Sequence, residues 1–387
     1  MILLSLLLIT VCCLIIWRAS DGFETASEYL GRNLSEGVRG ATINAIGSSM
    51  PELFTTLFFL FILKDKDGFA GGIGTTAGSA IFNGMIIPAV VILIVVFKGI
   101  KSSVTISRKV LFRDGLALLL CELVLIFLIG GTKLTWIHGL ILMVMYGAYA
   151  TYMLKSMNES EDSSNLDEND ENEENEVLSN PKNLFINFLT LNLEPIFIRN
   201  KITSKNAWPL LLIATTIIGS ACLLLVKSCE LLGEELGIPI YFIAVVLASA
   251  ATSVPDTILS MKDAQKGNYD DAVSNALGSN IFDVCFALGF PLFLFTIIHG
   301  DIEMSEATIL NIAELRILLF ILTLIAFIIY VGRNKMGVIS AFLLLLIYVS
   351  FTLFILGKAF DSSFSTEVSI WLGIINEQID SLRFWTR

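Results

Sequence analysis

Long apolar segments alternate with short polar ones along this chain of 387 residues. Ten apolar runs approach the length of roughly 20 residues that a helix needs to cross a bilayer. They are residues 2–17, 41–63, 69–97, 115–130, 135–153, 207–226, 237–261, 271–298, 317–332 and 337–357. No run alternates apolar and polar residues as a membrane barrel strand does, and backbone groups in lipid must bond within their own segment. The pattern predicts an all-α polytopic membrane protein with about ten transmembrane helices.

The composition agrees with this prediction, since 55% of the residues are hydrophobic and the mean hydropathy is +0.77. The first run lacks the basic start and the small-residue cleavage site of a signal peptide, so we interpret it as a helix.

The six cysteines contain no CxxC pair, and His138 and His299 lie far apart. We therefore expect buried free thiols and no imidazole metal site. Nothing in the sequence indicates a nucleic-acid partner, an obligate protein partner or an enzyme cofactor.

The net charge of −11 belongs almost wholly to one segment. Residues 159–176 carry ten carboxylates and no Lys or Arg, and subtracting those ten charges leaves −1 for the rest. This segment has low complexity and no aromatic residue, which predicts disorder within a 155–206 linker. We expect a solvated spacer, with a regulatory calcium-binding role as the alternative.

The basic residues predict the orientation. In a ten-helix topology, 17 of the 25 lie on one side of the membrane. They are Arg18, Arg32, Arg39, Lys98, Lys101, Arg108, Lys109, Arg113, Lys155, Lys182, Arg199, Lys201, Lys205, Lys262, Lys266, Arg333 and Lys335. Because cytoplasmic loops are enriched in Lys and Arg, we expect a cytosolic linker, both termini outside, and a plasma-membrane location.

Two segments are copies of each other. ATINAIGSSMPELFTTL is followed by GTTAGSAIFNGMIIPAVV, and ASAATSVPDTILSM by AVSNALGSNIFDVCFALG. Glu52 thereby aligns with Asp256, Ser79 with Ser279, and Asn83 with Asp283. The first copy would begin in the cytosol and the second outside, as in secondary transporters with a midplane site. We predict inverted five-helix repeats over 1–154 and 207–358, the linker between them, and a tail over 359–387.

Each copy places polar chemistry inside an apolar run. Pro51 and Pro255 cannot donate a backbone hydrogen bond, which releases the carbonyls of Gly47 and Ala251. Four polar pairs lie on shared helix faces at i, i+4 spacing. They are Ser48 with Glu52, Thr252 with Asp256, Ser79 with Asn83, and Ser279 with Asp283.

All of these groups offer oxygen. Ionised side chains inside a membrane cost at least about 2.5–3.5 kcal/mol and mark functional sites. Oxygen ligands suit Ca²⁺ and Na⁺, and the absence of thiolates and imidazoles argues against zinc, copper or iron. The alternative for the hydroxyls alone is a bond to their own helix backbone, and glycines such as Gly74 and Gly78 indicate close helix packing.

Glu122, an acid without a repeat partner, is either an interhelical contact or a proton-titrating accessory.

At GSSMPEL, GSAIFN, ATSVPDT and GSNIFD the sequence resembles the sodium/calcium exchangers of the calcium/cation antiporter superfamily. The resemblance implies that Glu52 and Asp256 bind Ca²⁺ and that Asn83 and Asp283 complete the centre. It implies Na⁺ and Ca²⁺ oxygens from Ser48, Ser49, Thr252, Ser253, Ser79 and Ser279, with extra carbonyl ligands near Ala45 and Ser249. By the same resemblance, helices 2–17 and 207–226 slide across a fixed core, and alternating access exchanges several Na⁺ for one Ca²⁺.

Other classes fit less well. Proton/calcium exchangers of the superfamily typically carry GNxxE instead of the serine–proline motif, whereas Asp283 leaves K⁺ co-transport open. Neither Asp256 nor Asp283 sits in the GxGD sequence of intramembrane aspartyl proteases, so we do not expect an enzyme. A passive channel usually builds its filter from several subunits rather than from an inverted pair within one chain.

In the tail, SIWLGIINEQI predicts either an amphipathic interfacial helix or a flexible end.

Overall fold

The structure, a computed structural model, describes residues 1–32, 45–161, 186–187, 190–198, 201–333 and 335–381. In these ranges eight helices are long and apolar enough to cross a membrane. Two further predicted runs are also helical: a shorter apolar helix over Met50–Leu63, and α6 (Arg108–Leu128), which carries more charge. The prediction of an all-α multi-pass membrane protein with about ten helical passes is therefore confirmed.

The first repeat runs from α1 to α7. Its elements are α1 (Ile2–Leu30), α3 (Ala45–Ser48), α4 (Met50–Phe58), the π-helix η2 (Phe59–Leu63), α5 (Asp65–Phe97), α6 (Arg108–Leu128) and α7 (Trp136–Glu161). α1 continues well past the predicted end at residue 17. Its added part buries small and polar residues such as Ser20 and Ser27 against protein, so hydropathy alone did not reveal its length.

The second repeat runs from α10 to α17. Its elements are α10 (Ser204–Leu236), α11 (Ile240–Ile243), η4 (Ala244–Ala248), α12 (Ser249–Thr252), α13 (Val254–Lys266), α14 (Tyr269–Phe282), η5 (Asp283–Ala287), α15 (Leu288–His299), α16 (Glu306–Gly332) and α17 (Val338–Ala359). The linker contributes α9 (Glu194–Phe197). Most of the acidic segment 159–176, predicted to be disordered, lies outside the described residues.

Two short β pairings demonstrate that the repeats are inverted. At one end β1 (Lys133–Leu134) pairs antiparallel with β2 (Ile302–Glu303), and at the other end Val104 bridges Met336. β1 follows the fourth long helical pass of its repeat, whereas β2 follows the third pass of the second repeat. Val104, in contrast, follows the third pass of the first repeat, and Met336 follows the fourth pass of the second repeat. Equivalent connections therefore lie at opposite ends of the molecule, as the topology predicted.

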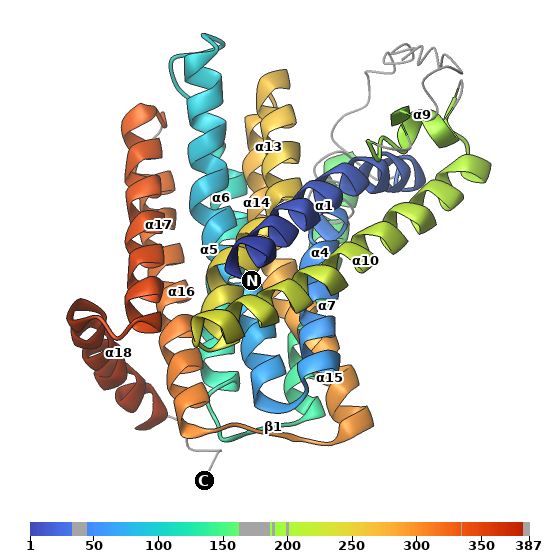
Figure 1. Cartoon of the computed structure of the whole chain (residues 1–387). Coiled ribbons are helices and arrows are strands. Elements are labelled where there is room, and N and C mark those ends of the chain that lie inside the picture. The colour runs from blue at the N-terminus through green and yellow to red at the C-terminus, as the bar shows by residue number, and fades with distance from the viewer. Residues whose placement is uncertain (33–44, 162–185, 188–189, 199–200, 334, 382–387) are drawn as a thin grey trace.

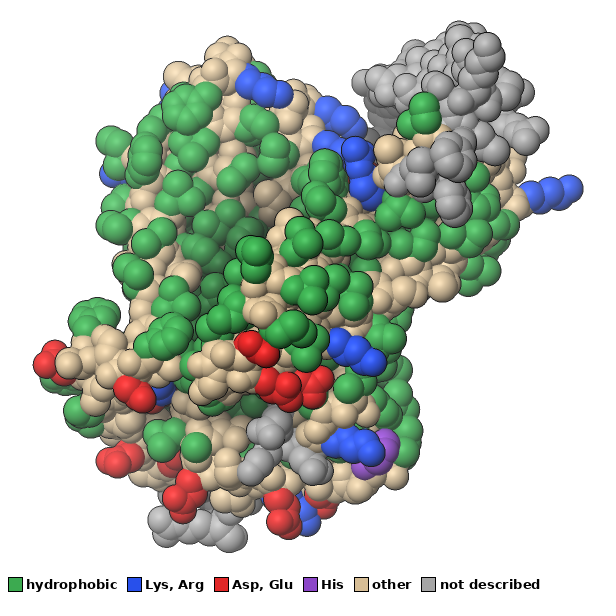
Figure 2. Space-filling view, in the orientation of Figure 1, with side chains coloured by type: hydrophobic (Ala, Val, Ile, Leu, Met, Phe, Trp, Pro, Cys, Tyr) green, Lys and Arg blue, Asp and Glu red, His purple; other side chains and the backbone are tan. Residues whose placement is uncertain are grey.

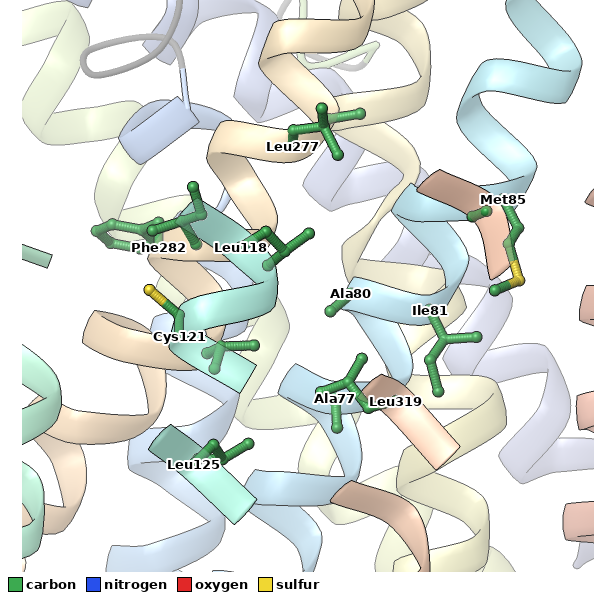
Figure 3. Packing of buried hydrophobic residues seen from close by; sticks show 14 of the residues in the cluster. Ala77, Ala80, Ile81, Met85, Leu118, Cys121, Leu125, Leu277, Phe282 and Leu319 are labelled. Atoms are coloured by element: carbon green, nitrogen blue, oxygen red, sulfur yellow. The ribbon is translucent and has the colours of Figure 1, made fainter. Parts of the chain in front are cut away.

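The helices form two packing units. α1 and α10 lie side by side and cross the remaining helices obliquely (Figure 1). This pair packs in one hydrophobic cluster, which includes Ile16 and Ile218 and extends to Phe59 and Ala251 of the motif helices. A second cluster surrounds α5, where Ala77, Ala80, Ile81 and Met85 face residues of α6, α14 and α16 (Figure 3). The central position of α5 brings it into contact with both repeats.

Charges are unevenly distributed over the two ends. Figure 2 shows hydrophobic side chains over the middle of this face, with the visible Asp and Glu side chains in its lower half. The end that carries Val104 and Met336 also carries Lys98, Lys101 and Lys335. We call it the basic end, and we call the end with β1 and β2 the acidic end.

The tail forms a helix, α18 (Ser363–Ser381), which packs against α16 and α17. Ser369 donates a hydrogen bond to Glu314 (3.2 Å), and the buried Arg316 donates one to Asn376 (2.9 Å). Large apolar side chains, among them Trp371 and Ile374, stay exposed on α18. The predicted helix is therefore present over the described part of the tail, and its position in a membrane interface stays a prediction.

Candidate cation-binding site

The two motif helices break at corresponding residues. α3 ends at Ser48 and α4 begins at Met50, while α12 ends at Thr252 and α13 begins at Val254. The residues between them, Ser49 and Ser253, have nearly the same backbone angles (φ −92°, ψ 8° and φ −81°, ψ 0°). Each break comes two residues before a proline, which is well tolerated in the first turn of the next helix. A helix break therefore accompanies each of the two prolines that the sequence analysis singled out.

The breaks put two of the site's three carboxylates at the starts of helices. Glu52 lies in the first turn of α4 and Asp256 in the first turn of α13, whereas Asp283 lies within the continuous helix Tyr269–His299, where α14 passes into η5. All three side chains are fully buried. The positive end of a helix dipole favours a negative charge at Glu52 and Asp256, but it offsets only part of a desolvation cost of several kcal/mol per ion. None of the ion pairs found among the described residues involves these acids.

Ser79 on α5 joins both repeats. Its hydroxyl lies 3.0 Å from Glu52 Oε1, 3.1 Å from Asp283 Oδ2 and 2.8 Å from Ser253 Oγ. A hydroxyl has one proton, so it can satisfy only one of these two carboxylates at a time. The site therefore contains more anionic oxygen than this hydroxyl can satisfy.

The other contacts lie both between the repeats and within them. Asn83 donates to Asp256 Oδ2 (2.9 Å), Ser279 donates to Asp256 Oδ1 (2.9 Å), and the hydroxyls of Ser48 and Ser279 lie 3.4 Å apart. With the Ser79 contacts and the 3.4 Å bond from Asn83 to Ser79, these link eight of the ten predicted site residues into one network. They are Ser48, Glu52, Ser79, Asn83, Ser253, Asp256, Ser279 and Asp283.

The remaining two predicted residues lie at the helix breaks. Thr252 is fully buried and donates to the carbonyl of Ala248 or Ser249 (3.1 Å each), which is the backbone bond that the sequence left as the alternative. The hydroxyl of Ser49 is buried without a hydrogen-bond partner. The carbonyls of Ala45 and Ser249 each accept from the amide four residues on, at 3.1 and 3.0 Å.

Several buried oxygens of the network have no hydrogen-bond partner. They are Glu52 Oε2, Asn83 Oδ1 and Asp283 Oδ1, in addition to Ser49 Oγ. Buried polar atoms are normally paired, so unpartnered acceptors point to a group that completes them. Oxygen acceptors with negative charge fit a hard cation such as Ca²⁺ or Na⁺. Within the described chain no three carboxylates, imidazoles or thiolates gather as a metal cluster, so hydroxyl and amide oxygens would have to take part.

The structure adds features that the sequence reading missed. Two π-helical segments flank the site, η4 before α12 and η5 from Asp283 onward, and such segments are frequent at functional sites. Asn280 donates to the carbonyl of Ala80 (2.8 Å) and so ties α14 to α5. The sequence could have indicated Asn280, because it follows Ser279 in the motif GSNIF. The first copy gives no matching signal, because Ala80 occupies the aligned position.

Glu122 lies outside this network. Thr323 of α16 donates to its Oε1 (2.8 Å), which is the interhelical contact that the sequence offered as one interpretation. A second buried acid of α6, Asp114, was not predicted. It is bound by Arg113 (2.6 Å) and Ser274 (2.7 Å), which makes it a paired structural group at the basic end.

Comparison with known proteins agrees with the fold and the motifs. Residues 4–155 and 206–357 match the family described as "Sodium/calcium exchanger protein". Human sodium/potassium/calcium exchanger 5 is 27% identical over 341 residues, which cover 70% of this chain and 65% of that protein. Human sodium/potassium/calcium exchanger 3 is 41% identical over 117 residues, 30% of this chain and 17% of that protein. The chain thus spans at most about two thirds of these relatives.

Two solved structures share the fold. The sodium-calcium exchanger NCX_Mj, soaked with Na⁺ and Sr²⁺, has a TM-score of 0.55 at 21% identity, covering 90% of this chain and 97% of its own. The H⁺/Ca²⁺ exchanger CAX has a TM-score of 0.59 at 14% identity, covering 98% and 91%. At these identities the likeness concerns the fold alone.

Inverted repeats, paired broken helices and a buried oxygen site define the chain as a membrane transporter rather than an enzyme. Because the family match covers most of both repeats, the chain belongs to the sodium/calcium exchanger family of the calcium/cation antiporter superfamily.

Proposed function

We propose that the chain exchanges Na⁺ for Ca²⁺ across a membrane by alternating access. The observation that carries the proposal is the surplus of buried acceptors. Three carboxylates share two hydroxyls and one amide as donors, and two carboxylate oxygens and the amide oxygen of Asn83 stay unpartnered. A cation bound among them would supply the missing positive charge. Divalent Ca²⁺ offsets more of this charge than Na⁺, which fits competition between one Ca²⁺ and several Na⁺.

The ligands in this proposal are the ten residues of the broken helices and of α5, α14 and η5. They are Glu52, Asp256, Asp283, Asn83, Ser48, Ser49, Thr252, Ser253, Ser79 and Ser279. The α1–α10 pair, which packs against the motif helices through an apolar cluster distinct from the one around α5, is the element that would slide across the site. We also propose a plasma-membrane location with the basic end in the cytosol, since cytoplasmic loops are enriched in Lys and Arg.

The test is radiocalcium uptake into Na⁺-loaded proteoliposomes diluted into Na⁺-free medium. We expect uptake that needs the sodium gradient and is lost in Glu52→Gln and Asp256→Asn, because each change removes a charged ligand. Glu122→Gln is the matched control, since it neutralises a buried acid outside the network and keeps an acceptor for Thr323. Uptake that ignores sodium and follows a pH gradient would contradict Na⁺ coupling, and equal loss in all three variants would contradict the assigned site.

Potassium co-transport is a second candidate, favoured by one residue. Asp283 gives the site a third carboxylate where the first copy has Asn83, and the relatives compared above are named sodium/potassium/calcium exchangers. The same uptake assay with and without external K⁺ distinguishes the two. A K⁺ requirement that Asp283→Asn abolishes would favour co-transport, whereas uptake without K⁺ would leave plain Na⁺/Ca²⁺ exchange.

A further inference from the structure

A narrow crevice leads from the surface of α1 to the buried network. Ser20, Asp21 and Glu24 of α1 line one side, Pro255 and Leu259 of α13 line the other, and Ser48 lies among its lining residues. Its volume of about 10 Å³ is close to the space that one water molecule needs. Ser48 also contacts Ser279 of the network, so the crevice adjoins the site itself.

The α1 side of the crevice is lined by oxygen. Asp21 and Glu24 are three positions apart and so lie on one helix face. Ser20 is 7% exposed, and its hydroxyl has no hydrogen-bond partner. The crevice thus offers two carboxylates and one unpartnered hydroxyl to a cation, next to the buried centre.

The described structure already places one positive group on these carboxylates. The Lys262 ammonium lies 2.8 Å from Asp21 Oδ1 and 3.7 Å from Glu24 Oε2. Lys262 follows Ile258, another lining residue, by four positions on α13, so it lies one turn further toward the basic end. Its side chain is 46% exposed, which leaves the ammonium free to exchange with an ion from solution.

We propose that Ser20, Asp21 and Glu24 form an access site for Ca²⁺ or Na⁺, and that Lys262 occupies it when no ion is present. An arriving cation displaces the ammonium from the carboxylates and then has a short route to Ser48, the hydroxyl that lines the crevice beside the network. This proposal rests on the exchange function proposed above. It extends that function by a second cation site on α1, outside the duplicated motifs.

Transport measured separately from each membrane face tests the proposal, using inside-out and right-side-out vesicles at low ionic strength. Asp21→Asn and Glu24→Gln should raise the half-saturating Ca²⁺ concentration roughly three- to tenfold from one face only. Lys262→Met should lower it from that same face, because the competitor is gone while the apolar stem stays. Lys98→Met is the matched control, a loss of positive charge at the same end whose partner is Gln265 instead of a carboxylate.

A simple clamp between α1 and α13 predicts a different pattern. Removing either partner would break the same ion pair, so all three variants would shift in one direction, and that result would overturn the access site. An effect of equal size from both faces, or none, would overturn it as well.

An equilibrium measurement separates this proposal from exchange itself. Tb³⁺, a luminescent substitute for Ca²⁺, is sensitised by nearby indole rings, and Trp17 lines the crevice. We expect luminescence of the detergent-solubilised chain that falls in Trp17→Phe and in Asp21→Asn/Glu24→Gln. Its persistence in both would overturn the access site even if exchange is intact. If the luminescence is lost in both variants and the parent chain shows no sodium-dependent uptake, the access site is supported and only the exchange function is contradicted.

Discussion

At the scale of single residues, the site depends on hydroxyls as much as on carboxylates. Ser79 lies within 3.1 Å of Glu52, Asp283 and Ser253, and so it touches both repeats at once. Leaving buried polar groups without their partner costs about 1–3 kcal/mol each. The hydroxyl is also one of the proposed ion ligands, so its removal should affect ion affinity more than folding.

Ser79→Ala is expected to weaken Ca²⁺ binding by about tenfold or more, the equivalent of roughly 1.4 kcal/mol or above. The measurement is the Ca²⁺ concentration that half-saturates the thermal stabilisation of the purified protein. Ser228→Ala provides the control, because Ser228 is equally buried but bonds only to the carbonyl of Leu224 (2.8 Å). Equal Ca²⁺ affinity in the two variants would show that Ser79 is not a ligand.

At the scale of elements, the site depends on how closely α5 approaches η4 and α12. A Cβ atom at Gly78 would lie 2.3 Å from the carbonyl oxygen of Val245 and 2.9 Å from Ser249 Cβ. Both obstacles belong to the broken helix that carries Thr252 and Asp256. The missing side chain at position 78 therefore lets α5 hold Ser79 against the second repeat.

Gly78→Ala should lower the free energy of unfolding by about 1–3 kcal/mol through overpacking and should reduce exchange with it. Gly84→Ala on the same helix serves as the control, since its Cβ would meet only Asn280 Nδ2 at 3.6 Å. At position 84 the alanine should stabilise the protein by up to about 1 kcal/mol, because alanine has a higher helix propensity than glycine and its side chain meets no close neighbour. Thermal unfolding of the two purified variants measures the difference, and similar behaviour of both would contradict the close approach.

At the scale of the whole molecule, the charge asymmetry leads to a prediction of sidedness. Ser102 lies in the loop of the Val104–Met336 bridge, and Thr132 lies beside β1 at the opposite end. Both side chains are exposed. With the basic end in the cytosol, the two positions should face opposite compartments.

We expect an impermeant maleimide to label Thr132→Cys in intact cells, and Ser102→Cys only after permeabilisation. The parent chain is the control, because five of its six cysteines are buried and Cys13 is half-buried. Labelling of Ser102→Cys from outside would reverse the proposed orientation. Labelling of both positions in intact cells would contradict their placement at opposite ends.

Much of this architecture was predictable from local pattern. Over its described residues each of the ten apolar runs is mainly helical, because backbone in lipid has few alternatives to the helix. The broken helices were predictable from Pro51 and Pro255, since the effect of proline on a helix is local. The duplication of GSSMPEL and ATSVPDT likewise identified which polar residues to consider, and eight of the ten do meet in one network.

The sequence by itself determined the number and kind of helices, their breaks, and the candidate oxygens. Only the tertiary structure decided that Asn83 bonds to Asp256 of the other repeat as well as to Ser79 of its own, that Ser79 is shared, and that Lys262 lies against α1. The π-helical segments and the full length of α1 also came from the structure alone. The physical reason is that these features depend on side-chain packing between segments over 150 residues apart, whereas hydropathy and proline act over a few turns of one helix.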